Sequence, residues 1–267
     1  MTVLQAIIMA IVEGLTEFLP ISSTGHMALT SAILNITDKE FSNLFIETVQ
    51  FGAIISVLVL YWRKFLNFKS FDFYLKLLVA FIPAAIVGVL LKKRIEELIQ
   101  SPLFITIIMF LGGFILLFID KWFKNPTIEK EENITYKNSL IIGIFQLLAV
   151  VFPGFSRSAA TIMGGMQQKL NRTMAAEFSF FLAVPTLAGA FAKGLWDAYR
   201  HNPELLTHHN INLIILGNIV AFVVAVIAIK GFITFLIKHG FVLFGWYRII
   251  IGFLLLVFLL TGHSLSL

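Results

Sequence analysis

The 267-residue chain contains no cysteine and few charged side chains. The absence of cysteine excludes a disulfide scaffold, a thiolate metal site and a cysteine nucleophile. Charged residues make up only 13% of the chain, against roughly 25% in soluble domains. Hydrophobic residues reach 58% and the mean hydropathy is +0.92. A soluble protein of this size could not bury so much apolar surface, so the composition predicts a polytopic membrane protein.

Three further features are missing from the sequence. The apolar runs do not alternate with polar residues, which argues against barrel strands and favours an all-α protein. No arginine-rich arm accompanies the net charge of +5, so we expect basic cytoplasmic loops and no nucleic-acid partner. No basic segment precedes the first apolar stretch, which Glu13 interrupts, so we expect no cleavable signal peptide.

Six apolar stretches are long enough to cross a membrane as helices. Two others, residues 3–12 and 139–152, are shorter and are followed by Pro20 and Pro153. Their length fits re-entrant hairpins, whose irregular backbone must be buried inside the helix bundle. The six predicted spans are residues 44–62, 74–91, 103–120, 176–196, 211–229 and 241–260.

One hairpin followed by three spans occurs twice, with the two prolines 133 residues apart. Three crossings place the second copy on the opposite side, which predicts an inverted repeat. We expect one integral membrane domain, residues 1–267, with repeat 1 at about 1–120, a cytoplasmic loop at about 121–138 and repeat 2 at about 139–267. The loops on one side carry 12 Lys and Arg, Lys69 and Lys130 included, and those on the other carry 6, Lys39 included. The positive-inside rule makes the first side cytoplasmic and places both termini outside.

Polar residues and Pro20 interrupt the apolar pattern at residues 13–26, which we call the first break. Two carboxyl groups lie in it. Glu13 and Glu17 are four residues apart, so a helix places them on one face. In a poorly polarisable medium they share a proton or hold a cation between them, and either state suits acid–base or metal-assisted chemistry. The alternative is a helix end that faces the lipid headgroups.

Ser22, Ser23, Thr24 and His26 follow within the same break. A serine beside a histidine is typical of an activated nucleophile, and histidine can itself attack phosphorus. Such a serine-rich turn can also be a helix cap, but the neighbouring carboxyl groups favour catalysis.

The second break, residues 153–161, has the residues typical of an anion-binding loop. Arg157 supplies a planar fork suited to phosphate oxygens, unless it merely pairs with a glutamate. The residues around it offer a free backbone, hydroxyls and helix N–H groups: Gly154, Ser156, Ser158 and Thr161. Arg248 is a further candidate for binding the substrate or acting as a counter-ion. Glu47 and Gln50 share a helix face and are candidates for orienting the residues that contact the substrate. A purely structural role is the alternative for Arg248, Glu47 and Gln50.

Residues 13–26 and 153–161 resemble the two signature motifs of the bacterial undecaprenyl-diphosphate phosphatases, the bacitracin-resistance family. The resemblance covers nearly the whole chain. It implies an enzyme of the bacterial inner membrane that removes the terminal phosphate from a C55 polyprenyl diphosphate, so that the lipid carrier is reused for peptidoglycan and other envelope polymers. It also implies stimulation by a divalent cation (Mg²⁺ or Ca²⁺), interleaved inverted repeats, a pocket open to the outer side, and a homodimer.

Carried over by position, the family's acidic pair is Glu13 and Glu17, its Ser/His group includes Ser22, Ser23 and His26, and its phosphate-binding arginine is Arg157. We expect in-line attack on phosphorus by Ser23 or His26, with Glu17 as proton acceptor and with Glu13 and Glu17 holding the cation. The competing class is a transporter for the lipid carrier or an ion-coupled carrier, because inverted repeats with broken helices also build carriers. A carrier needs binding groups but no nucleophile, so the Ser/His group favours the enzyme.

Overall fold

The structure is a computed structural model that describes residues 1–67 and 71–261. Lys69, one of the positive charges counted above, lies outside the described residues. Within these ranges the chain is helical and contains no strand, only an isolated bridge between Ile128 and Leu170. The helices are α1 (Val3–Thr16), α2 (Ser23–Ile33), α3 (Lys39–Leu60), α4 (Trp62–Phe65), α5 (Phe71–Leu90), α6 (Lys92–Ile99), α7 (Pro102–Trp122), α8 (Tyr136–Val151), α9 (Arg157–Gln167), α10 (Arg172–His201), α11 (His208–His239) and α12 (Val242–Leu260), with short 3-10 turns at Glu131–Asn133 and Pro203–Leu205.

Six of the described helices are long and apolar enough to cross a membrane, as the hydropathy pattern predicts. They are α3, α5, α7, α10, α11 and α12. The largest difference from prediction is at α11, which continues ten residues beyond Ile229. Hydropathy falls at Lys230, but the helix continues until Gly240, where a backbone φ of 65° ends it. A left-handed glycine is the usual residue at such an end.

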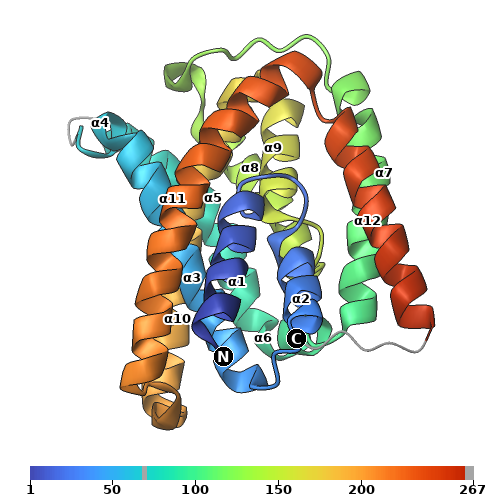
Figure 1. Ribbon diagram of the computed structural model, residues 1–267. Coiled ribbons are helices and arrows are strands. Elements are labelled where there is room, and N and C mark those ends of the chain that lie inside the picture. Colours follow the sequence, from blue (N-terminus) through green and yellow to red (C-terminus); the bar gives the residue numbers. More distant parts are fainter. Residues whose placement is uncertain (68–70, 262–267) are drawn as a thin grey trace.

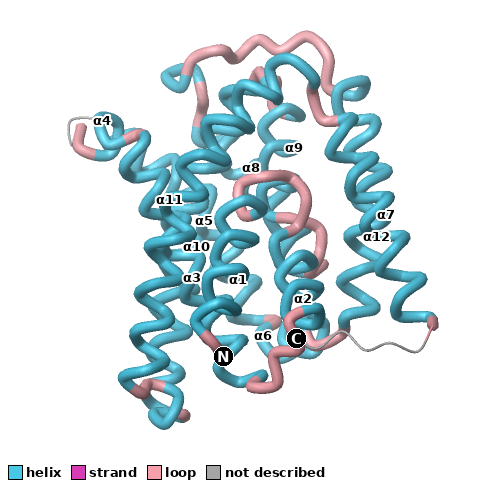
Figure 2. The backbone as a smooth tube through the Cα atoms, viewed as in Figure 1, coloured by secondary structure: helices cyan, strands magenta, loops and turns pink. Residues whose placement is uncertain are grey.

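The two short apolar stretches form paired helices, α1 with α2 and α8 with α9. In Figure 1, α1 reaches the middle of the molecule from the lower end and α2 returns, whereas α8 and α9 make the same excursion from the upper end. The two connecting loops lie beside each other at mid-height in Figure 2. The two breaks predicted from the sequence are therefore neighbours in space.

The two halves of the chain pack into each other. Helix α1 packs against α11, and α8 packs against α5. Both contacts use a glycine, because a Cβ added at Gly14 would lie 2.7 Å from the carbonyl oxygen of Ala221. At Gly143 the carbonyl of Ala80 is closer still. Close helix approach of this kind is typical of membrane bundles, and it fixes the short helices that carry the breaks.

An aromatic contact fixes the backbone next to Glu17. Phe18 is fully buried and packs edge-to-face on Phe180 of α10, with ring centroids 5.2 Å apart. Such a pair stabilises a fold by about 0.5–1.5 kcal/mol beyond the burial of its area. It anchors the residue that follows Glu17, so the position of this carboxylate is set by packing against α10.

Candidate functional site

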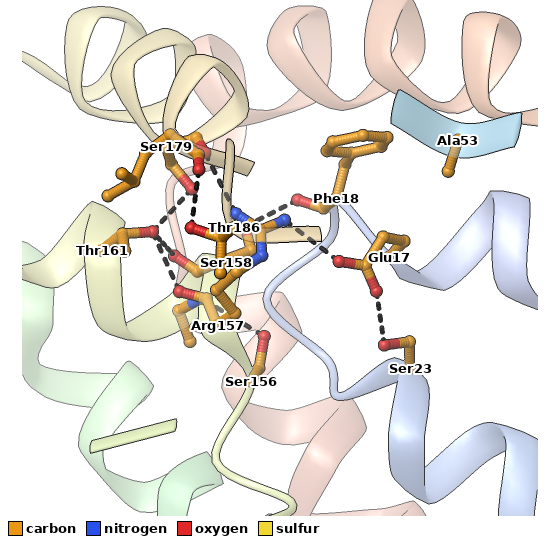
Figure 3. Close-up of polar contacts among 12 residues, drawn as sticks. Glu17, Phe18, Ser23, Ala53, Ser156, Arg157, Ser158, Thr161, Ser179 and Thr186 are labelled. Atoms are coloured by element: carbon orange, nitrogen blue, oxygen red, sulfur yellow. Dashed lines mark hydrogen bonds and ion pairs between the residues drawn. The ribbon is translucent and has the colours of Figure 1, made fainter. Parts of the chain in front are cut away.

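Glu17 joins the two breaks. Its Oε2 accepts a hydrogen bond from the Ser23 hydroxyl at 2.7 Å, and its Oε1 accepts one from Nη2 of Arg157 at 3.1 Å (Figure 3). The Glu17 side chain is 5% exposed and that of Arg157 is 11% exposed. Hydrogen bonds to charged groups are stronger than those between neutral groups, and burial strengthens them further. The structure thus brings together three of the predicted catalytic residues, from segments 140 residues apart.

One more contact joins the two breaks, and another ties Arg157 to α10. The Ser158 hydroxyl donates to the carbonyl of Phe18 at 2.7 Å. Arg157 also donates from Nη1 to the carbonyl of Ser179 at 3.0 Å, which ties it to α10 (Figure 3). The hydroxyls of Thr161 and Ser179 are 2.6 Å apart and support this corner of the site. The expectation that the two loops meet inside the bundle is confirmed.

Two serines set where the site helices begin. Ser22 and Ser156 have φ of 74° and 79°, a left-handed conformation that costs a non-glycine residue roughly 1–3 kcal/mol. Each accepts a hydrogen bond from the backbone N–H three residues later, at 3.3 and 3.2 Å. They therefore act as N-caps, which agrees with the capping alternative for Ser22. Ser23 and Arg157 become the first residues of α2 and α9, where the positive end of the helix dipole favours an anion.

His26 is held differently from Ser23. Its Nδ1 lies 2.7 Å from the carbonyl oxygen of Ser22, and its Nε2 lies 2.7 Å from the hydroxyl of Tyr247 on α12. Both ring nitrogens are therefore occupied, and neither contacts Glu17 or Arg157 in the described hydrogen bonds. Sequence reasoning missed Tyr247, although its position directly before Arg248 in an apolar span was a signal.

Glu13 is fully buried, and neither of its carboxyl oxygens has a hydrogen-bond partner among the described residues. A bond to the nearby Glu17 carboxyl would need a proton on one of the two, because both ionised groups only accept. The Nε of Arg157 is also buried without a partner. An unpaired donor and unpaired acceptors thus lie on residues that flank Glu17, where a bound anion and a bound cation would satisfy them.

Arg248 is bound by the backbone of three segments. It is fully buried, and all five N–H donors of its guanidinium are directed at backbone carbonyls. One set belongs to the breaks, at Pro20, Gly154 and Phe155, and the rest to α7. No donor remains for a phosphate, so the geometry does not favour a substrate-binding Arg248. Its guanidinium instead holds both loops against α7. Gly154 itself, with φ of 98°, contributes a carbonyl to this clamp.

Glu47 faces α10 away from this cluster. It lies opposite Gly194 and lines a hollow of about 190 Å³ together with Asp197 and His201. Gly194 is 15 residues along α10 from Ser179, which is roughly 22 Å at the helical rise. A role of Glu47 in supporting the site stays a prediction.

Two expected site residues form no described hydrogen bond with this cluster. Gln50 is half-buried on α3, and no described hydrogen bond joins it to Glu17, Ser23 or Arg157. Thr24 is half-buried on the first turn of α2, next to Ser23. Substrate binding by Thr24 stays a prediction, as do the roles proposed for Ser156, Ser158 and Thr161.

Comparison with known proteins agrees with the motifs. Residues 6–254 match the family model described as bacitracin resistance protein BacA. The chain is 52% identical over 267 residues to an undecaprenyl-diphosphatase of Flavobacterium johnsoniae, covering 100% of this chain and 99% of that protein. It is 52% identical to one of Flavobacterium psychrophilum, covering 100% of both chains. It is 48% identical to one of Bdellovibrio bacteriovorus over 100% of this chain and 99% of that protein.

Proposed function

The chain belongs to the BacA family of bacitracin resistance proteins, and we propose that it is an undecaprenyl-diphosphatase. It removes the terminal phosphate of undecaprenyl diphosphate and so returns the lipid carrier, as the monophosphate, to the synthesis of peptidoglycan and other envelope polymers. The names of relatives about half identical over the full chain support this function. A multi-pass protein of the bacterial inner membrane agrees with the six apolar helices.

The observation that carries the proposal is the contact of one carboxylate with both a hydroxyl and a guanidinium. Glu17 accepts the Ser23 hydroxyl on one oxygen and the Arg157 guanidinium on the other. A nucleophile paired with a base is the arrangement of covalent catalysis, and a guanidinium beside it suits a phosphoryl group. A carrier has no use for the first of these contacts, so the site favours the enzyme over the transporter.

The proposed reaction has two balanced steps. Ser23 Oγ forms a bond to the terminal phosphorus and gives its proton to Glu17, while the bond from that phosphorus to the bridging oxygen breaks and undecaprenyl phosphate leaves with the electron pair. The oxygen of a water molecule then bonds to the phosphorus of the phosphoserine and the bond from phosphorus to Ser23 Oγ breaks. Glu17 returns its proton to Ser23 Oγ, and the proton lost by the water leaves with inorganic phosphate or to solvent. Arg157 stabilises the charge on the transferring group through its fork of donors. Attack by His26 is the alternative, but its ring lacks the direct contact with a carboxylate that Ser23 has.

We propose that Glu13, together with Glu17, holds a divalent cation, Mg²⁺ or Ca²⁺. The unpaired, buried carboxyl oxygens of Glu13 fit this role. The described residues contain no group of three or more acidic or histidine side chains arranged to hold a metal. One or two carboxylates completed by substrate phosphates is the usual arrangement for Mg²⁺. When bound, the cation would neutralise charge on the diphosphate.

We also propose that α1–α2 and α8–α9 are re-entrant hairpins of an inverted repeat. The first unit, at about 1–120, is followed by the cytoplasmic loop at about 121–138 and by the second unit, at about 139–267. The pocket of this arrangement opens to the outer side. A homodimer stays a prediction. Packing of α1 on α11 and of α8 on α5 supports the repeat, as do helix N-caps that recur 133 or 134 residues apart. These caps are Thr2 and Thr135, Ser22 and Ser156, and Asp38 and Asn171.

The test is phosphate release from undecaprenyl diphosphate by the purified protein in detergent micelles. Micelles have no two compartments, so transport cannot produce a signal. The enzyme predicts one inorganic phosphate and one undecaprenyl monophosphate for each molecule consumed. Substrate that binds but stays intact would instead indicate a carrier and overturn the proposal.

A further inference from the structure

The hydrogen bonds of His26 determine which of its nitrogens carries the hydrogen. The carbonyl oxygen of Ser22, 2.7 Å from Nδ1, can only accept, so Nδ1 must carry a hydrogen. In the neutral ring Nε2 then holds a lone pair. The Tyr247 hydroxyl lies 2.7 Å from Nε2, so it donates to that lone pair. One tautomer of His26 satisfies both contacts.

Tyr247 is placed to hold this ring in position. The planes of the Tyr247 and His26 rings differ by 5°, with centroids 5.6 Å apart. The next residue on α12, Arg248, fastens both loops through their carbonyls. Successive residues of α12 therefore fix the loops and the imidazole. His26 is 8% exposed, whereas Tyr247 is 40% exposed, so the imidazole is the more deeply buried of the two rings.

This geometry bears on which group attacks phosphorus. An attacking imidazole needs a free lone pair, but the Nε2 lone pair of His26 is engaged by Tyr247, and Nδ1 carries a hydrogen directed at Ser22. The Ser23 hydroxyl is instead hydrogen-bonded to a carboxylate that can accept its proton. Ser23 is three residues before His26 on α2, so both side chains lie on the same face of the helix.

We propose that Tyr247 is a positioning residue that donates to Nε2 of His26 and so holds the ring in the tautomer protonated at Nδ1, in which His26 orients the first turn of α2 beside Ser23 and does not attack phosphorus. No covalent bond forms or breaks at His26 in this role, because the Tyr247 hydroxyl occupies the Nε2 lone pair. The inference rests on the proposed phosphatase function.

The first test is Tyr247→Phe, which removes the hydroxyl and keeps the ring. Because the change leaves the His26 ring without its Nε2 partner but removes no phosphate ligand, kcat should fall by about tenfold, on the scale of one lost hydrogen bond, with KM within about twofold. Tyr136→Phe is the matched control: it removes a hydroxyl that donates to Asp72 at 2.6 Å, outside the site, and should leave both constants unchanged. Unchanged kcat in Tyr247→Phe, or a rise in KM alone, would overturn the proposal.

A double-mutant comparison separates positioning from a direct role. In a His26→Asn background, Tyr247→Phe should cause no further loss, because the group through which it acts is gone. A tenfold loss that persists in this background would mean that Tyr247 acts on the substrate itself, contrary to the proposal.

A spectroscopic readout is independent of turnover. In protein labelled with ¹⁵N-histidine, the signals missing from His26→Asn identify His26. The wild type should show Nδ1 protonated and Nε2 unprotonated, and Tyr247→Phe should move the Nε2 signal while Tyr136→Phe does not. A ring protonated at Nε2 alone would overturn the inference. If the wild type released no phosphate, the proposed function would fail, whereas these spectra would still decide how His26 is held.

Discussion

Replacing Arg157 with lysine should remove most of the activity although the positive charge is kept. The guanidinium reaches two partners on different elements, the Ser179 carbonyl at 3.0 Å and the Glu17 carboxylate at 3.1 Å, and its Nε remains unpaired. A lysine ammonium is a single point of charge and cannot reproduce this fork. Losing one donor aimed at developing charge costs about 2.7–4 kcal/mol, or 10²–10³ in rate. Because part of the charge interaction survives, we expect kcat/KM to fall about 30- to 300-fold.

The assay is phosphate release in detergent, with thermal unfolding of the same preparation as a check on folding. Arg172→Lys is the matched control, because Arg172 donates from Nε to Asp120 at 2.8 Å and its side chain is 40% exposed. The same substitution there should change activity less than about twofold, in line with the small energies of exposed ion pairs. If folded Arg157→Lys retained activity within about threefold of the wild type, the bidentate role of Arg157 would be refuted.

Three further predictions concern the acidic pair and the topology. Glu17→Gln should lower kcat about 10²–10⁴-fold, the range for a lost general base, without preventing extraction of folded protein; near-normal phosphate release would show that Glu17 is not the base. Glu13→Ala should raise the divalent-cation concentration needed for half-maximal rate by about tenfold or more, and an unchanged titration would remove Glu13 from the cation site. An impermeant thiol reagent should label Lys39→Cys in intact cells but Lys130→Cys only in opened cells, and the reverse pattern would invert the proposed orientation.

Much of the helical framework could be predicted because span length and hydropathy are local properties. The sequence located all six apolar helices, and most of their ends lie within a few residues of the predicted ones. The end of α11 was missed because Lys230 lowers the hydropathy, whereas the helix continues to the left-handed Gly240. Helix ends depend on backbone geometry that hydropathy does not contain.

For the site, residue types and the meeting of the two breaks could be predicted, but side-chain directions could not. Glu17 and Arg157 were identified from their places in the two breaks and from the resemblance of residues 13–26 and 153–161 to the family's motifs. The sequence left Arg248 open between substrate binding and a structural role. Only the structure shows that its donors face carbonyls, whereas Arg157 points to Glu17. Nor could the sequence show that Glu47 faces a distant hollow or that Tyr247 holds His26. Both depend on how helices from different halves of the chain rotate against each other.

The central claim is that Ser23, activated by Glu17, accepts the phosphoryl group. It is tested most directly by rapid quenching of the enzyme with undecaprenyl diphosphate labelled in its terminal phosphate. We predict label that appears transiently on Ser23 with the acid stability of a phosphoserine, decays as inorganic phosphate appears, and is absent from Ser23→Ala. Acid-labile label on His26, or turnover by Ser23→Ala at the wild-type rate, would contradict the account.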